Sequence, residues 1–149
     1  MSDTFSDPTV RTEFSAGGVV VRGDDVVVIV PVKRDAAGNR VLALPKGHPD
    51  GAETAEAAAL REVREETGVD GELVGKLGDV RYWYQRRGRR VFKLVAFFLI
   101  EYRSGDLGDH DHEVEEARWM PMAEAARSLT YAGEREMVVR ALSQRASDR

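Results

Sequence analysis

Three glutamates near the middle of the chain have the spacing needed to bind a divalent cation together. Glu62, Glu65 and Glu66 stand at positions i, i+3 and i+4, which share one face of a helix. Three carboxylates on one face repel one another unless something neutralises them. A hard divalent cation that prefers oxygen ligands, such as Mg²⁺, does this well. Taken alone, the helix also fits a solvated surface face rich in Glu and Arg.

The residues around this face favour the metal site. The stretch before it is Gly47-His48-Pro49-Asp50-Gly51-Ala52-Glu53, and after seven more residues the chain continues as Arg61-Glu62-Val63-Arg64-Glu65-Glu66-Thr67-Gly68-Val69. These 23 residues resemble the Nudix box, which is Gly, five residues, Glu, seven residues, Arg-Glu-aliphatic-any-Glu-Glu-any-Gly-aliphatic. All nine specified positions match at their spacing, which makes the resemblance highly specific.

The resemblance implies a role for each matching residue. The catalytic, metal-binding carboxylates would be Glu62, Glu65 and Glu66, and the backbone carbonyl of Lys46 would be a further ligand. The cofactor would be Mg²⁺, with Mn²⁺ as an alternative. Glu62 is the first choice for the general base, and the other candidates lie in a later loop: Glu113, Glu115 and Glu116. Structural roles would fall to Gly47, Glu53, Arg61 and Gly68. One departure is Ala52, where family loops often have glycine.

The box does not choose the substrate, so residues outside it carry that prediction. The lead-in Leu44-Pro45-Lys46-Gly47-His48 is similar to diadenosine polyphosphate hydrolases, as are Trp119-Met120-Pro121 and Leu129-Thr130-Tyr131 with Arg135. The resemblance therefore implies a Mg²⁺-dependent hydrolase of phosphoanhydride bonds in nucleoside diphosphate-linked substrates, with diadenosine polyphosphates first. The alternatives are a (d)NTP pyrophosphohydrolase, a hydrolase of ADP-ribose, inositol pyrophosphates or RNA 5′ ends, and a module that senses nucleotides without cutting them.

Several side chains outside the box are candidates for substrate binding. The basic ones, which would contact phosphate, are Lys33, Arg34, Lys46, Arg81 and Lys93, and His48 stands beside the metal loop. Tyr82, Trp83, Tyr84 and Tyr131 are candidates for stacking on a base. Each of these residues also fits an ordinary surface or core position. The arginine-rich segment 86–90 could grip a polyphosphate or a capped RNA end, but a solvated hairpin tip that discourages edge pairing is the simpler interpretation.

The elements that must position these residues alternate along the chain. Strands are expected at 14–22, 26–33, 41–44, 71–84, 91–102 and 117–120, and helices at 53–67, 121–129 and 134–145. This order predicts a mixed β-sheet between helices in one α/β domain. The resemblance implies the Nudix α/β/α sandwich over residues 13–149, after a loose tail at 1–12.

Bulk properties limit the class of protein further. The 149 residues include 22 basic and 26 acidic side chains, and this net charge of −4 argues against binding of duplex nucleic acid. The absence of cysteine excludes a disulfide framework and a cysteine nucleophile. The longest apolar stretch, 91–100, is too short to span a bilayer and contains Lys93, and the first residues carry no signal-peptide pattern. We expect a cytoplasmic monomer or homodimer whose partner is a small nucleotide or polyphosphate.

Overall fold

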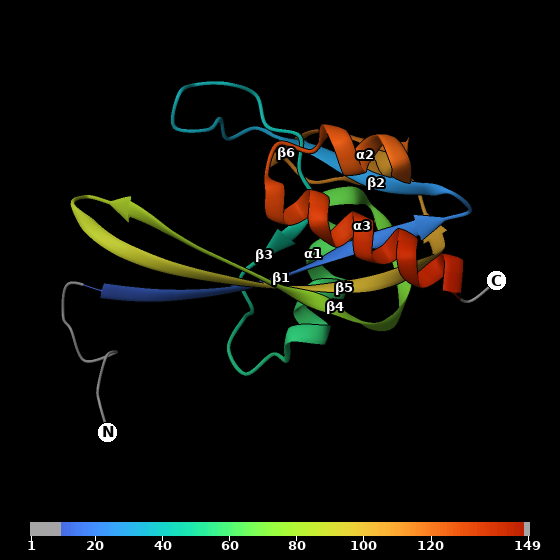
Figure 1. The fold of residues 1–149 in the computed structure, drawn as a ribbon, viewed down its shortest axis with the longest axis horizontal. Helices are drawn as coiled ribbons and strands as arrows, with labels where there is room; N and C mark the ends of the chain where they lie inside the picture. The colour runs from blue at the N-terminus through green and yellow to red at the C-terminus, as the bar shows by residue number, and fades with distance from the viewer. Residues whose placement is uncertain (1–9, 148–149) are drawn as a thin grey trace.

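A computed structural model of the chain describes residues 10–147. The fold has three layers. Figure 1 shows a twisted β-sheet with helices packed on both of its faces. The elements in chain order are β1 (Val10–Arg22), β2 (Asp25–Pro31), β3 (Lys46–Gly47), α1 (Ala55–Thr67), β4 (Val69–Arg86), β5 (Arg89–Gly105), the 3-10 turn η2 (Leu107–Asp109), β6 (Val114–Pro121), α2 (Met122–Ser128) and α3 (Ala132–Ser147). The predicted sandwich with a mixed sheet is confirmed.

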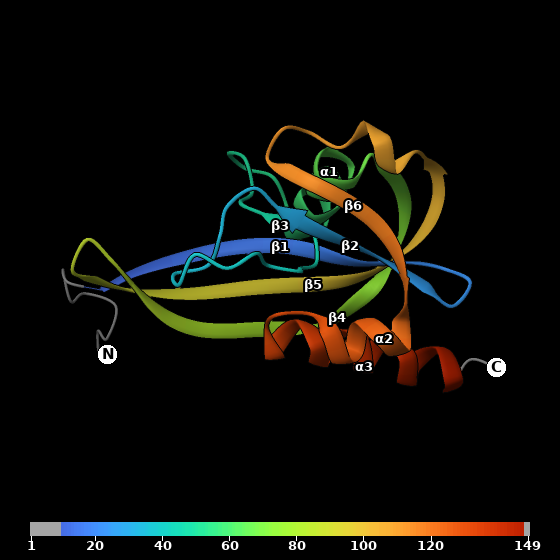
Figure 2. The same cartoon turned by 90° about the horizontal axis from the view of Figure 1, so that it is seen from above.

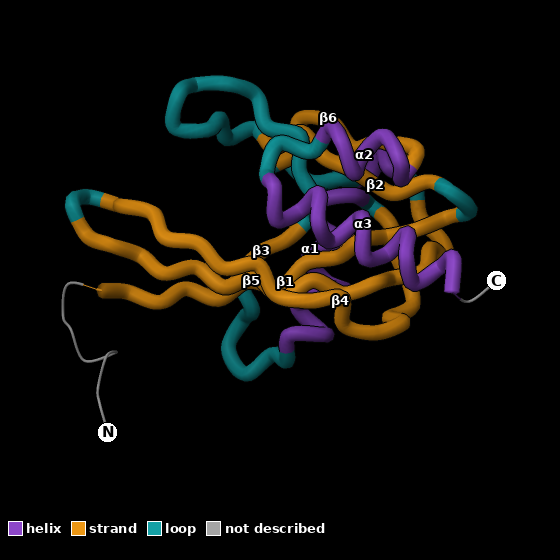
Figure 3. The backbone as a smooth tube through the Cα atoms, viewed as in Figure 1, coloured by secondary structure: helices purple, strands orange, loops and turns teal. Residues whose placement is uncertain are grey.

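The sheet has the order β4-β5-β1-β2-β6, and β3 pairs with β1 outside this path. The β1–β5 pair is parallel and the other pairs are antiparallel, so the sheet is mixed. Figure 2 shows α1 on one side of the sheet, with α2 and α3 together on the other. The two long strands β4 and β5 form a hairpin that extends well beyond the helices, as the strand tube of Figure 3 makes clear.

The second part of the central strand β1, residues 16–21, is apolar, and both of its faces are buried. Ala16 and Val20 pack in the core under α1, whereas Val19 and Val21 pack in the core under α2 and α3. All four side chains are at most 2% exposed. A strand covered on both sides is apolar throughout rather than alternating, which explains the Gly-Gly-Val-Val-Val sequence.

The position of α1 follows from its caps and its buried face. Thr54 Oγ1 accepts the N–H of Ala57 at 3.1 Å, and Gly68 ends the helix in the left-handed conformation with φ of 80°. Ala59 and Val63 are fully buried against the sheet. The remaining side of the helix, which carries the box glutamates, is therefore directed away from the core.

Two expectations about strands need correction. The strand predicted at 41–44 is absent; only an isolated bridge joins Ala43 to Ile29. The reason is that neighbouring amides bond to side chains: the N–H of Leu42 donates to Thr130 Oγ1 and the N–H of Leu44 donates to a carboxylate of α3. At the start of the chain, β1 includes residues 10–12 of the predicted tail, which pair with β5. The rest of that tail lies outside the described residues.

Within residues 10–147, no helix is both long and apolar enough to cross a bilayer.

Candidate functional site

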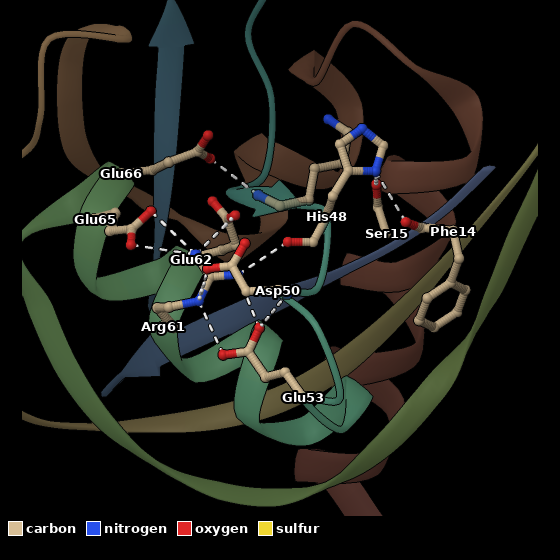
Figure 4. Close-up of polar contacts among 10 residues, drawn as sticks. Phe14, Ser15, His48, Asp50, Glu53, Arg61, Glu62, Glu65 and Glu66 are labelled. Carbon is tan, nitrogen blue, oxygen red and sulfur yellow. Dashed lines mark hydrogen bonds and ion pairs between the residues drawn. The ribbon is translucent and has the colours of Figure 1, made fainter.

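Arg61 lies at the centre of the carboxylates of α1 (Figure 4). Its Nη1 is 3.2 Å from Glu62 Oε2 and 3.2 Å from each Glu65 carboxylate oxygen. Its Nε is 2.9 Å from Glu53 Oε2. One guanidinium is thus shared among several carboxylates, so the negative charge of this face exceeds the positive charge available to it.

The same arginine joins the box loop to the helix. Arg61 Nη2 donates to the backbone carbonyl of His48 at 2.9 Å, and Glu53 Oε1 accepts the N–H of Asp50 at 2.9 Å. The hydrogen bond from Arg61, together with that from Asp50, lowers the pKa of Glu53, while the Glu53 carboxylate raises the pKa of Arg61. These bonds fix the loop that leads into α1.

Burial makes the ionised form of two box glutamates costly. Desolvation raises the pKa of Glu66 to about 8, although the backbone N–H of Lys46 donates to Glu66 Oε1 at 3.0 Å. Desolvation also raises the pKa of Glu62 above its usual value. A Cβ at Gly47 would lie 2.1 Å from Glu62 Cδ, so only glycine leaves room for this carboxylate. A cation nearby would relieve both costs.

The side chains present fit a hard divalent ion. Glu62, Glu65 and Glu66 supply only oxygen donors, as Mg²⁺ and Mn²⁺ require, and Glu62 and Glu66 are partly buried at a cost that a cation offsets. Among residues 10–147, however, no three acidic or imidazole side chains are already gathered into a metal site. Arg61 holds Glu62 and Glu65 instead, so ion binding requires these carboxylates to turn away from it. The Lys46 carbonyl stays a predicted ligand.

The box glutamates border one end of a two-part cleft. The first part is a cavity of about 880 Å³, and its walls include Glu62, Glu65, Glu66 and Arg61. The second part is about 620 Å³ and has apolar walls that include Val80, Val95 and Phe97. Pro31, Lys33, Lys46 and Tyr82 line both parts. The cleft therefore joins a charged end to an apolar end through a shared basic and aromatic boundary.

The structure brings all the predicted substrate-binding residues to this cleft. Lys33, Lys46 and Tyr82 line both parts; His48 and Lys93 line the charged part, and Arg34, Arg81 and Tyr131 line the apolar part. Lys93 is only 8% exposed, and this burial lowers its pKa despite the nearby Glu13. Tyr82 and Tyr131 are 42% and 44% exposed, so both rings are accessible to a ligand.

The sequence reasoning missed Glu134, a 3% exposed carboxylate at the start of α3. Its Oε1 accepts the N–H of Leu44 at 2.8 Å, and its Oε2 is 2.9 Å from Lys46 Nζ. Burial acts to lower the pKa of Lys46, but the ion pair and hydrogen bond with Glu134, together with the nearby Glu66 and Tyr82, raise this pKa above its usual value. Glu134 thus fixes both the loop backbone and the lysine at the boundary of the cleft. An acidic residue in the first turn of a helix is too common for its sequence to reveal this role.

The later acidic loop contributes unequally to the site. Glu113 lines the charged part of the cleft. Glu115 and Glu116 do not line the cleft: Glu115 pairs with Arg40 and with Arg34, and Glu116 is 3.7 Å from Arg118. Of the three alternatives to Glu62 as general base, only Glu113 therefore faces the cleft.

Two of the residues that resemble diadenosine polyphosphate hydrolases, Trp119 and Arg135, contact other parts of the protein and do not line the cleft. The Trp119 ring packs edge-on against Tyr102, with the Arg22 guanidinium 4.0 Å from its centroid, and it does not line the cleft. Arg135 donates to the backbone carbonyls of Leu129 and Thr130. Of this group, Tyr131 reaches the cleft.

Comparison with known proteins places this geometry in a family. The NUDIX domain model matches residues 12–141. The putative mutator protein MutT4 of Mycobacterium tuberculosis is 42% identical over 130 residues, 84% of this chain and 52% of that protein. The 8-oxo-(d)GTP phosphatase of Mycolicibacterium smegmatis is 35% identical over 97 residues, 65% of this chain and 29% of that protein. The chain thus spans about half or less of these relatives.

Solved structures agree on the fold. A NUDIX hydrolase from Nitrosomonas europaea superposes with a TM-score of 0.75 at 19% identity, over 90% of both chains. An Ap4A hydrolase of C. elegans superposes with a TM-score of 0.66 at 18% identity, over 91% of this chain and 98% of that one. Because the family model covers most of the sequence and the structure has the same sandwich, the chain belongs to the Nudix hydrolase family.

Proposed function

We propose that this chain is a Mg²⁺-dependent hydrolase that cuts a phosphoanhydride bond in nucleoside polyphosphates. The observation that carries the proposal is the two-part cleft, with box carboxylates at one end and an apolar cavity at the other. A polyphosphate needs a metal and cations, whereas a base needs an apolar slot with aromatic rings. The boundary residues Lys33, Lys46 and Tyr82 stand where the two halves of such a ligand would meet.

The protein groups have distinct parts in this proposal. Glu62, Glu65 and Glu66 would hold Mg²⁺, which supplies charge neutralisation of the phosphates and a lower pKa for a bound water. A carboxylate oxygen of Glu62 accepts the proton of the attacking water, and Glu113 is the alternative acceptor because it faces the same cavity. Lys46 and Lys93, which line the same cleft, neutralise phosphate oxygens. Their positions are set by Glu134 and Glu13, respectively.

Among substrates of this class, nucleoside triphosphates are the first candidate. The apolar cavity of about 620 Å³ suits one nucleoside, and similar proteins are a mutator protein and an 8-oxo-(d)GTP phosphatase. Diadenosine polyphosphates are the second candidate. They are favoured by the Leu44–His48 lead-in and by the position of Tyr131 in the cleft.

A substrate panel with product analysis tests both candidates. The purified chain is incubated with Mg²⁺ and nucleoside triphosphates, 8-oxo-dGTP, diadenosine polyphosphates, ADP-ribose or inositol pyrophosphates, and the products are separated by ion exchange. Monophosphate and pyrophosphate from a triphosphate would support the first candidate, and ATP or ADP from a diadenosine substrate the second. Binding of nucleotides without any cleavage would overturn hydrolysis in favour of a sensing module.

A further inference from the structure

The hairpin of β4 and β5, with the start of β1, forms an arm that extends away from the body of the molecule (Figure 1). We define the arm as residues 10–14 and 81–93. Residues 81–93 include six of the 22 basic side chains and no acidic one, so the rest of the chain has 16 basic and 26 acidic side chains. Positive charge is thus concentrated in one projecting element of an acidic protein.

The strand register divides the arm into two faces. Directly paired residues share a face, and the pairs Tyr82–Lys93, Tyr84–Val91 and Arg86–Arg89 follow one another without a register shift. In β1, Arg11 and Glu13 pair with Val91 and Lys93. We call this set the cleft-side face: Arg11, Glu13, Tyr82, Tyr84, Arg86, Arg89, Val91 and Lys93. The opposite face carries Trp83, Phe92 and Arg90.

The cleft-side face continues from the proposed active site. Tyr82 and Lys93 line the charged part of the cleft. The Tyr84 ring lies 6.1 Å beyond Tyr82, and the Arg86 guanidinium is 5.4 Å from the Tyr84 ring. Aromatic and cationic groups therefore form an unbroken row from the cleft to the tip of the hairpin.

This face has more positive charge than its own carboxylate can balance. Glu13, its one acidic side chain, accepts the Tyr84 hydroxyl at 2.5 Å and the Arg86 guanidinium at 2.8 Å, and lies 3.8 Å from Lys93 Nζ. Within residues 10–147, Arg11 and Arg89 have no carboxylate within 4 Å, and both are exposed. Protection of a sheet edge requires charge but not an aromatic row that leads into a cleft.

We propose that the cleft-side face binds the chain of a single-stranded oligonucleotide whose 5′-polyphosphate end occupies the cleft. Arginines spaced along a groove pair with successive phosphates, and Tyr rings offer stacking platforms to unpaired bases. A strand that enters with its 5′ end would place its terminal anhydride beside the box glutamates. The proposal rests on the proposed hydrolase function for that last step, whereas binding by the arm does not depend on it.

The double variant Arg11→Ala/Arg89→Ala tests the proposal. Fluorescence anisotropy measures binding of a labelled 5′-hydroxyl oligonucleotide of about eight nucleotides, and product analysis measures hydrolysis of its 5′-triphosphorylated form and of a free nucleoside triphosphate. We expect the variant to bind about tenfold more weakly, with the salt dependence of log K reduced by about 0.7 for each phosphate that no longer has an arginine partner. Its KM for the 5′-triphosphorylated oligonucleotide should rise similarly, while hydrolysis of the free triphosphate stays unchanged.

Two controls separate this face from general charge effects. Arg90→Ala removes a charge from the opposite face of the arm, and Arg118→Ala/Arg127→Ala removes two charges from exposed positions on β6 and α2. Both should bind the oligonucleotide nearly as wild type does. Equal losses in the controls, or no binding by wild type, would overturn the proposal. So would light scattering that shows a homodimer dissociated by Arg11→Ala/Arg89→Ala, because the arm would then contact a second copy.

The results also distinguish this proposal from the proposed function. If no substrate is cut but the arm variant still loses oligonucleotide binding, the hydrolase fails and the binding face stands. If free triphosphates are cut but the arm variant binds and hydrolyses the oligonucleotide as well as the wild type does, the hydrolase stands and the arm proposal fails.

Discussion

Two groups of carboxylates border the cleft, and they differ in how their charge is balanced. On the α1 side, Glu53, Glu62 and Glu65 share the single guanidinium of Arg61, and Glu66 is partly buried, which raises its pKa to about 8. On the α3 side, Glu134 has one partner, Lys46, and one backbone N–H. The α1 side has unbalanced negative charge, as the proposed metal site requires. On the α3 side, the charge of Glu134 is balanced by Lys46 without a ligand. The difference separates the proposed catalytic site on α1 from a structural support on α3.

The largest expected effect is on catalysis, from the α1 side. Glu65→Gln removes one proposed metal ligand from an exposed position, so kcat with Mg²⁺ should fall about 100- to 1,000-fold, which corresponds to several kcal/mol of barrier. The melting temperature should change little. Glu56→Gln, an exposed glutamate in the first turn of the same helix, is the matched control and should keep full activity. Near-normal turnover by Glu65→Gln would show that α1 does not hold the metal.

On the α3 side the expected effect is on stability. Glu134→Gln keeps an acceptor for the Leu44 N–H but leaves Lys46 without a counter-charge. Because the Lys46 side chain is 25% exposed, we expect a loss of about 2 kcal/mol in the free energy of unfolding, below the range for a fully buried pair. Urea denaturation measures this loss of free energy, provided that the variant and the wild type have the same m-value.

The same helix offers a control for this prediction. Glu136 pairs with Arg140 at the surface, so Glu136→Gln should cost less than about 0.5 kcal/mol. Adding Lys46→Met to Glu134→Gln should restore part of the stability, because no unpaired charge remains. If Glu134→Gln is as mild as Glu136→Gln, the pair at the cleft boundary is not a structural support.

The unbalanced charge of the α1 side should also appear as a pH dependence. The pKa of Glu66 is about 8 in the folded chain, against an ordinary value of 4.5. Between these values the folded state keeps a proton that the unfolded chain releases. The free energy of unfolding without metal should therefore fall as pH rises through this window.

Thermal melts at several pH values, with and without Mg²⁺, test this dependence. Mg²⁺ should stabilise the protein more near pH 8 than near pH 5, because it binds the ionised carboxylate. Glu66→Gln should flatten the pH dependence of the metal-free protein, and Glu56→Gln should leave it unchanged. A wild-type profile that rises through this window would contradict the burial cost of Glu66.

The smallest expected effect is that of a surface ion pair, and it gives a baseline for the variants on the α1 side and on the α3 side. Arg64 pairs with Asp70 at the surface, where their side chains are 67% and 47% exposed. Arg64→Ala should change the free energy of unfolding by less than about 1 kcal/mol and leave kcat unaltered. A large loss of activity would place Arg64 in the site, although it does not line the cleft.

Parts of this structure that depend on neighbours in the sequence were predictable. The helix of the box follows from its alanines and its Gly68 stop, and its face of glutamates follows from i, i+3 and i+4 spacing. Strands β1 and β2 were predicted from their valine-rich runs, whereas the two-residue strand β3 was not predicted. Errors arose where partners are distant: the amides of Leu42 and Leu44 bond to Thr130 and Glu134, respectively, which no local pattern reveals.

The sequence by itself determined the family, the three box glutamates and the basic residues that could contact phosphate. Only the tertiary structure decided how they combine: a cleft shared by β2, the box loop, the hairpin and α3, and a Lys46 held by Glu134. It also decided that Glu113, and not Glu115 or Glu116, faces the cleft. The physical reason is that spacing within one helix is fixed by backbone geometry, whereas contacts between distant segments depend on how the whole sheet and its helices pack.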